Sequence, residues 1–275
     1  MSALLTTGVL ACGTVADAQV WTGPYVGGSA GGSLQREDGR ETVGFDTNLD
    51  GNFTDEVRTI AGANAFSTGF CGGLAVNAMA SSGCTEDENG IDFGGRVGYD
   101  WQFGRLVVGG VVDAAAMDVI DSATAFSTTP AFYSFTRELK VTTGLRGRVG
   151  VGSGRVLLYG TGGAAWGNVE ETFTTSNAVN TFTNTRDGND SSDNSNNVWG
   201  YQAGGGIEYR FAGNWSLAGE YLFTDLDNRE SSTVRVQGPA PATNPFILVN
   251  ASGTDMRRAD TLQVHGVRFG VNYRF

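Results

Sequence analysis

The chain has 275 residues, a formal net charge of −11 and 42 glycines. Its acidic composition, with a sequence pI of about 4.5, and its lack of a basic patch argue against nucleic-acid binding. No stretch reaches the ~18 apolar residues of a membrane-spanning helix, and the many Gly, Thr, Val and aromatic residues predict β structure in one domain.

The first 18 residues, Met1 to Ala18, predict a secretory signal. They combine a short apolar centre with an A-x-A end at Ala16-Asp17-Ala18, although a positively charged beginning is missing. We therefore expect the natural start to differ and the mature domain to cover residues 19–275. The alternative is a lipoprotein cleavage site at Val9-Leu10-Ala11-Cys12, but the A-x-A site explains the same stretch.

Eight later segments of about ten alternating residues predict tilted strands that are long enough to cross a bilayer. They are Val20 to Leu34, Ile91 to Phe103, Arg105 to Met117, Glu138 to Gly152, Arg155 to Val169, Val198 to Ala212, Asn214 to Leu226 and Thr261 to Phe275.

The connections between these segments alternate strictly between short and long. The short ones are at Gly104, Ser153-Gly154 and Gly213-Asn214, and the long ones are Gln35 to Gly90, Asp118 to Arg137, Glu170 to Asn197 and Asp227 to Asp260. A β-sandwich gives no reason for this order. The pattern predicts an all-β fold: an eight-stranded antiparallel transmembrane up-and-down β-barrel with three short periplasmic turns and four long extracellular loops.

The first long loop, at about residues 35–90, contains a possible calcium motif, D-x-N-x-D-G, in which alternate oxygens can converge on one ion. Val57 stands where a bidentate Glu is expected, so a neighbouring carboxylate would have to substitute. The candidate ligands are Asp46, Asn48, Asp50, Asn52, Asp55 and Glu56. The alternative is a turn that these residue types form without an ion.

The same loop contains two cysteines. Removal of the signal takes away Cys12 and leaves Cys71 and Cys84 as an even pair in an oxidising compartment. This predicts a disulfide between them, the alternative being two free thiols.

Alternation within the strands assigns their faces. In the second strand Phe93 lies on the apolar face and Arg96 on the other. In the fourth, Leu139 lies on the apolar face, while Lys140 and Arg146 lie on the opposite one. The apolar face is expected to face lipid, because a charge there costs ~2–4 kcal/mol near the bilayer midplane.

The charges on the inward face are expected to fill the narrow lumen of an eight-stranded barrel as a salt-bridged plug with a net positive charge. They are Arg96, Asp100, Asp113, Lys140, Arg146, Arg148, Glu208, Arg210, Glu220, Arg268 and Arg274.

The last strand alternates in the same way, and its ending is distinctive. The spacing Arg268-x-Gly270-x-x-Tyr273-x-Phe275 resembles the C-terminal assembly signal of bacterial outer-membrane β-barrels. The resemblance implies the barrel-assembly machinery as a partner.

The opening Trp21-Thr22-Gly23-Pro24-Tyr25-Val26-Gly27-Gly28 resembles the W-T-G-x-Y-V-G-G opening of alphaproteobacterial outer-membrane β-barrel proteins. Gly98-Tyr99-Asp100-Trp101 and the Tyr273-Arg274-Phe275 ending extend the resemblance over the mature chain. This family is similar to the transmembrane domain of OmpA and to the major surface proteins of rhizobia. The resemblance implies a Gram-negative outer-membrane location, with outer-membrane lipids and lipopolysaccharide as neighbours.

We therefore expect a non-enzymatic structural surface protein whose loops contact an unidentified host or surface ligand. One alternative is a narrow channel for small solutes, which the same alternation allows. The other is a lipid-modifying enzyme using His265, the only histidine, but no nucleophile motif such as G-x-S-x-G accompanies it. The acidic loops are also expected to hold divalent cations.

Overall fold

The computed structural model describes residues 20–35, 41–184, 195–227 and 233–275. The predicted signal, residues 1–18, lies outside the described residues. Within the described ranges, no helix combines the length and the apolar composition needed to cross a membrane.

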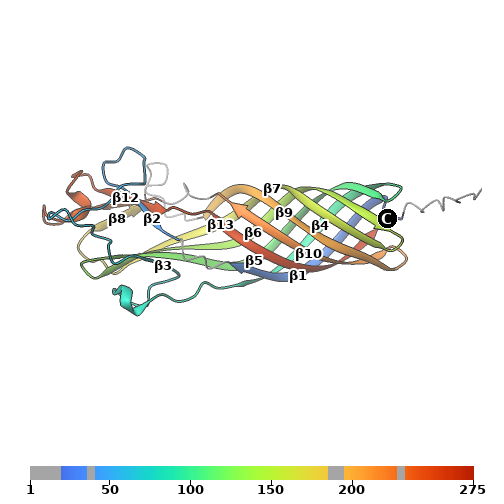
Figure 1. The fold of residues 1–275 in the computed structure, drawn as a ribbon, viewed down its shortest axis with the longest axis horizontal. Coiled ribbons are helices and arrows are strands. Elements are labelled where there is room, and N and C mark those ends of the chain that lie inside the picture. Colours follow the sequence, from blue (N-terminus) through green and yellow to red (C-terminus); the bar gives the residue numbers. More distant parts are fainter. Residues whose placement is uncertain (1–19, 36–40, 185–194, 228–232) are drawn as a thin grey trace, which may run out of the picture.

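Eight long strands form a closed ring in which each strand pairs with its neighbours in the sequence (Figure 1). The ring is closed by antiparallel pairing of the first strand with the last. This confirms the predicted eight-stranded antiparallel barrel. The ring strands are β1 (Gly23–Gln35), β4 (Gly90–Phe103), β5 (Leu106–Ser127), β6 (Ala131–Ser153), β7 (Val156–Thr175), β9 (Ser195–Ala212), β10 (Trp215–Leu226) and β13 (Leu262–Arg274).

Three two-residue turns join the ring strands at one end of the barrel. Gly104, Gly154 and Gly213 occupy the first position of these turns with φ of 62°, 54° and 49°. Glycine adopts this left-handed conformation without a steric penalty, and such turns match the twist of a hairpin. The predicted short turns are therefore confirmed.

The long connections meet at the other end, where they fold together instead of remaining irregular. β5, β6 and β7 continue well beyond the predicted strand ends, so most of the predicted loop Asp118–Arg137 is a strand hairpin. A separate four-stranded antiparallel sheet forms in the order β2-β12-β11-β8. Its strands are β2 (Val43–Asp46), β12 (Thr254–Arg258), β11 (Val234–Gln237) and β8 (Thr181–Asn184).

We call this end of the molecule the cap: residues 41–89, 118–137, 170–184 and 233–261. It also contains β3 (Phe70–Gly72), which pairs with β5, and the 3₁₀ turns η1 (Ala80–Ser82) and η3 (Pro245–Ile247). Its apolar core gathers side chains from all four long connections. The aromatic members of that core are Phe45, Phe66, Tyr133, Phe135 and Phe246, with Phe173 and Phe182 packed against them.

Candidate functional site

The barrel lumen contains ten buried charged side chains, which we call the lumen cluster. Each of its arginines lies within 4.0 Å of at least one carboxylate. The members are Arg96, Arg146, Arg148, Arg268 and Arg274 with Asp92, Asp100, Asp113, Glu208 and Glu220.

Arg146 lies at the centre of this cluster. Its guanidinium contacts Asp113 at 2.7 Å and Glu220 at 3.2 Å. Glu220 also lies 3.4 Å from Arg96 and accepts a hydrogen bond of 2.8 Å from the Tyr159 hydroxyl. A buried charge is tolerated only when its partners and hydrogen bonds replace water, and each of these groups is met from several strands.

Towards the short-turn end, aromatic rings close around the next layer of charges. Arg148 pairs with Glu208 and lies over the Tyr159 ring, 3.9 Å from its centroid. Arg274 contacts Asp100 at 2.8 Å and donates to the Trp21 carbonyl at 2.6 Å. Trp21 is completely buried, so this end of the lumen is filled by side chains.

Towards the cap, Arg268 joins the cluster through Asp92, which the sequence reasoning missed. Their side chains lie 2.8 Å apart, and Ser33 donates to the same carboxylate at 2.9 Å. Asp92 shares the parity of Arg96 and Asp100, so alternation within the second predicted strand could have identified it. With Asp92 included, the cluster has five arginines and five carboxylates and therefore no formal net charge, so the expected net positive charge of the lumen depends on Arg210 at its rim.

Lys140 does not belong to the lumen. The pairing of β6 with both neighbours shifts at this residue, which reverses the inward parity of the strand. Leu139 is consequently buried inside, while Lys140 lies outside and pairs with Glu138 at 3.2 Å and Glu170 at 2.9 Å. The predicted faces of both residues are wrong, because a β-bulge carries an extra residue that simple alternation cannot detect.

Arg210 faces inward as predicted, but it lies at the short-turn rim. Its guanidinium donates to the carbonyls of Val20 and Gly213. Among the described residues it forms no ion pair with a carboxylate, so it does not take part in the plug.

A second buried charged group, the neck cluster, lies between the lumen and the cap core. Arg137 donates to Asp121 at 3.0 Å and to Asp260 at 2.6 Å, and Arg258 reaches the same two carboxylates at 3.1 and 2.7 Å. Glu41 contacts Arg258 at 3.4 Å. These residues fall in or at the ends of the predicted loops, where no sequence pattern predicts a role for them.

Burial raises the pKa of Glu41 to about 8, and the negative charge of Asp121 adds to the effect, although Arg258 opposes it. Oxygens of Glu41, Asp87 and Asp121 lie within 4.8 Å of one another. The neighbouring arginines and a hydrogen bond from the Ser122 amide to Asp87 already engage these carboxylates.

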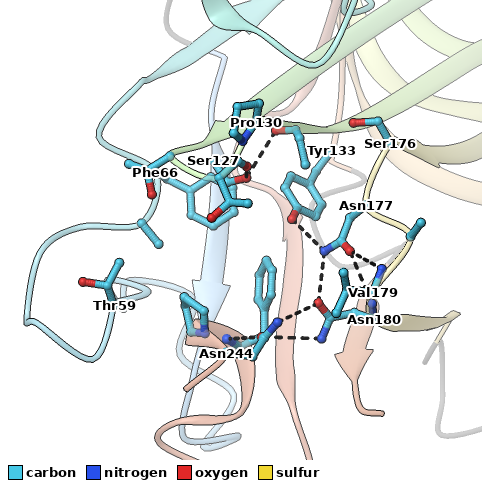
Figure 2. A pocket seen from close by; sticks show the side chains of 17 residues that line it. Thr59, Phe66, Ser127, Pro130, Tyr133, Ser176, Asn177, Val179, Asn180 and Asn244 are labelled. Carbon is cyan, nitrogen blue, oxygen red and sulfur yellow. Dashed lines mark hydrogen bonds between the residues drawn. The ribbon is translucent and has the colours of Figure 1, made fainter. Parts of the chain in front are cut away.

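A pocket of about 210 Å³, here called the tip pocket, lies at the end of the cap (Figure 2). All four long connections contribute to its wall, through Phe66, Ser127 to Ala131, Tyr133, Ser176 to Asn180 and Asn244 to Phe246. The amides of Asn177, Asn180 and Asn244 are joined by hydrogen bonds along one side of it.

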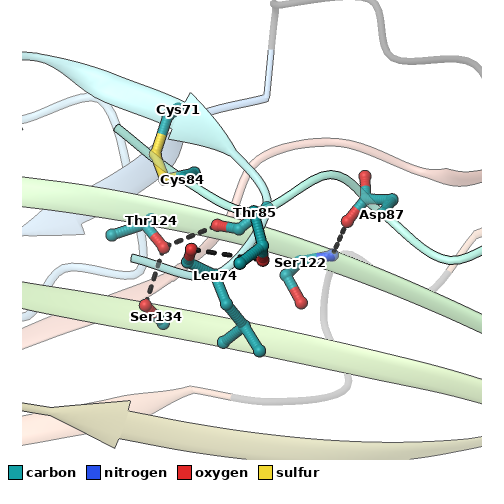
Figure 3. Close-up of a disulfide and its surroundings, with 9 residues drawn as sticks. Cys71, Leu74, Cys84, Thr85, Asp87, Ser122, Thr124 and Ser134 are labelled. Atoms are coloured by element: carbon teal, nitrogen blue, oxygen red, sulfur yellow. Dashed lines mark hydrogen bonds between the residues drawn. A yellow bond between two sulfur atoms is a disulfide. The ribbon is translucent and has the colours of Figure 1, made fainter. Parts of the chain in front are cut away.

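The predicted disulfide between Cys71 and Cys84 is present and joins β3 to a later part of the same long connection, beside β5 (Figure 3). Beside it, the Thr124 hydroxyl donates to the Gly73 carbonyl at 2.8 Å and lies 2.6 Å from the Ser134 hydroxyl. Strand pairing and this hydrogen bond therefore hold β3 at the side of the β5–β6 hairpin, and the bridge closes the segment between the two cysteines.

The calcium motif forms a tight turn. The buried Asp46 carboxylate accepts backbone hydrogen bonds from Leu49, Asp50 and Gly51 at 2.7, 3.2 and 2.7 Å. Within the same segment, the side chains of Asn48 and Asp50 accept hydrogen bonds from the backbone amides of Asp50 and Asn52, and the Asn48 amide donates to the Asp50 carboxylate. Asn52 accepts from a nearby hydroxyl. Asp55 accepts from Thr47, and Glu56 forms an ion pair with Arg58. These bonds stabilise the turn with or without an ion, so calcium binding stays a prediction.

The C-terminal strand places its predicted signal residues on two faces. Arg268 points into the lumen, and Phe275 is exposed outside with its ring 5.1 Å from Tyr273. His265 also lies on the outer face, and its Nδ1 is 2.6 Å from the Tyr221 hydroxyl.

The sequence matches a known protein family. The chain fits the family described as "Outer membrane protein beta-barrel domain" over residues 2–275. It belongs to this family. The protein is therefore an outer-membrane β-barrel, as the resemblance of its opening and ending implied.

Individual proteins are also similar to the chain. The chain is 28% identical over 204 residues to the "31 kDa outer-membrane immunogenic protein" of Brucella melitensis, covering 72% of each chain. It is 29% identical over 164 residues to the "22 kDa outer membrane protein" of Rhizobium leguminosarum, covering 58% of this chain and 64% of the relative. Among solved structures, OprG of Pseudomonas aeruginosa aligns with a TM-score of 0.48 and 12% identity, covering 92% of this chain and 97% of OprG.

Proposed function

We propose that this outer-membrane barrel is a non-enzymatic structural surface protein with a closed lumen, and that its cap makes the contacts outside the cell. The barrel would anchor the cap and contribute to envelope integrity. The contacts themselves would depend on the four long connections, because surface segments on a rigid scaffold commonly carry recognition.

The observation that carries this proposal is the lumen cluster. Its guanidinium groups span the interior from Arg268 near the cap to Arg274 near Trp21, and side chains fill an eight-stranded barrel readily. The neck cluster adds a second layer of buried ion pairs above it. A solute would have to break several of these pairs to pass.

Planar-bilayer conductance tests the closed lumen. Wild-type protein is expected to give no steady openings, and steady, reproducible openings would overturn the proposal. Arg146→Ala/Asp113→Ala removes two central partners and is the positive control for opening a path. A matched exterior variant, Leu145→Ala, should remain closed.

A narrow channel is the second candidate, and one observation favours it. Among the described residues, buried polar atoms of Gln202, Asn272 and Thr142 have no hydrogen-bond partner. Buried polar groups of this kind are commonly satisfied by water. A row of such waters would give small polar solutes a path, and the wild-type conductance measurement distinguishes the two candidates.

The position of His265 supports the non-enzymatic proposal over a lipid-modifying enzyme. Its ring lies on the outer wall against Tyr221 and Phe223, at 6.1 and 5.1 Å between centroids. Such an aromatic group suits the membrane interface. Overexpression of wild type and His265→Ala should leave lipid A equally unchanged in mass spectra, and a change that requires His265 would contradict this role.

We further propose outer-membrane lipids and lipopolysaccharide as neighbours of the barrel wall, and the barrel-assembly machinery as the partner that recognises its last strand. The exposed aromatic residues of that wall, such as Trp199, Trp101 and Phe275, are typical of a membrane-facing surface. Deletion of Phe275 should lower the yield of heat-modifiable protein in the outer membrane. Unchanged yield and gel mobility would contradict the assembly signal.

A further inference from the structure

We propose that the tip pocket binds one ring of an uncharged saccharide. The inference rests on the proposed function only in placing the cap outside the cell. The turn between β5 and β6 lines the pocket and lies at the end of the molecule opposite the short turns (Figure 1). Residues from all four long connections surround the pocket (Figure 2).

The size of the pocket suits a single six-membered ring. Its volume is about 210 Å³, whereas a cavity of about 150 Å³ is enough to hold benzene. The additional space matches a ring that carries several small substituents. A longer saccharide would have to place its remaining rings outside the mouth.

The lining is neutral, although the whole chain has a net charge of −11. None of the described residues that form the wall is acidic or basic. A buried charge without a partner is unfavourable, so the pocket disfavours amino acids, phosphates and carboxylated ligands. It suits a ligand whose polar groups are hydroxyls or amides.

The two kinds of wall fit the two faces of a sugar ring. Phe66, Tyr133 and Phe246 form a triangle of rings with centroids 5.4 to 5.9 Å apart, and Pro130 and Pro245 extend this apolar side. The C–H face of a pyranose can contact such a surface. Specificity in small-molecule pockets commonly comes from a few placed polar groups beside an apolar wall.

The hydroxyls that would contact the ligand are those of Thr59, Thr128 and Thr129. Their side chains line the pocket and form no hydrogen bond with any described residue. Ser176 adds another donor, because its oxygen accepts from the Phe132 amide at 3.0 Å and its proton can point elsewhere. A hydroxyl can both donate and accept, which suits a ligand made of hydroxyls.

The amide side of the pocket is rigid before any ligand arrives. The Asn177 oxygen accepts from the Val179 amide at 2.8 Å, and Asn244 accepts from the Phe246 amide at 3.1 Å. Asn180 then joins these two side chains at 3.0 and 3.1 Å. A preorganised wall lowers the entropy lost on binding.

The test is isothermal titration calorimetry of the full protein in lipid nanodiscs with glucose, galactose or N-acetylglucosamine. At least one of these neutral sugars should bind, while glucuronate should bind at least about tenfold more weakly, because none of the described residues in the wall is a cation. Thr128→Val/Thr129→Val should weaken binding at least about fivefold through lost hydrogen bonds. Ala178→Trp at the wall should abolish binding.

The matched control is Ala251→Trp, which places the same ring on an exposed position of the cap outside the pocket wall and should bind like wild type. Heat-modifiable gel mobility and the circular dichroism spectrum verify that each variant is folded. The inference is overturned if none of the three sugars binds wild type, if Ala178→Trp binds normally, or if phenol binds more tightly than every sugar. Conductance of wild type is independent of these outcomes, so failure here and failure of the closed-lumen proposal are distinguishable.

Discussion

The barrel and the cap have opposite interiors although one chain builds both. The barrel has a charged interior and an apolar exterior, with Arg146 buried and Leu145 exposed next to it. The cap has an aromatic core, in which Phe66 is buried among Phe45 and Tyr133. The medium outside each part explains the difference, because lipid excludes charges from the barrel wall and water favours burying the aromatic side chains of the cap.

The largest expected effect comes from breaking the barrel interior. Arg146→Met should destabilise the barrel by about 3–5 kcal/mol, because it leaves Asp113 and Glu220 buried with one partner fewer. Urea unfolding in lipid vesicles measures the change. Arg58→Met, which removes an exposed ion pair with Glu56, is the control and should lower the free energy of unfolding by about 0–1 kcal/mol. Equal losses of unfolding free energy in the two variants would contradict the role of the lumen cluster.

Breaking the cap interior should have a large but local effect. Phe66→Ala removes a ring that packs 4.5 Å from Phe45 and 5.4 Å from Tyr133, at a cost of about 3–5 kcal/mol. Amide exchange should become faster in the cap, while the heat-modifiable mobility of the barrel stays unchanged. Phe70→Ala, at an exposed position, is the control and should change amide exchange much less. If Phe66→Ala unfolds the barrel together with the cap, the two interiors are not independent.

A smaller effect is expected at the neck cluster between the two interiors. The Glu41 carboxyl has a pKa near 4.5 when exposed, and burial raises it to about 8 in the folded protein. Between these two pH values folding therefore takes up a proton. The neutral Glu41 carboxyl stabilises the folded cap fully below about pH 4.5, and this stabilisation is lost as the pH rises through 8. Protection factors of cap amides, corrected for intrinsic exchange, should fall between pH 5 and 8.

Glu41→Gln should remove most of this pH dependence, because the amide does not titrate. Glu86→Gln, which changes an exposed carboxyl of the same long connection, should retain it. If the protection factors of wild type and Glu41→Gln change equally with pH, another group is responsible.

The smallest expected effect is at the turn from Asp46 to Glu56, where backbone hydrogen bonds already hold the Asp46 carboxylate. Calcium at ~10⁻⁴–10⁻³ M should give heat in calorimetry and slow proteolysis of this segment. Asp46→Ala/Asp50→Ala should lose both responses. A double variant that responds like wild type, or a wild type without heat at millimolar calcium, would leave the motif as a turn only.

Sequence alone determined the barrel, because most ring strands repeat the same local rule and the connections between them alternate between short and long. Alternation of apolar and polar residues has a period of two, and two-residue turns with glycine mark where the chain reverses. Most of the lumen cluster was predicted from this parity. The disulfide between Cys71 and Cys84 was predicted by counting the cysteines that remain after removal of the signal. The rule failed at Lys140, where a bulge shifts the parity of β6 by one residue.

Only the tertiary structure decided the cap. Its core residues, such as Phe45, Tyr133 and Phe246, come from three different long connections and lie far apart in the sequence. No local period relates them, because each short strand pairs with a segment that the barrel brings near it. The neck cluster and the tip pocket depend on the same long-range contacts, so composition and spacing could indicate long polar connections but not the folded surface that they build together.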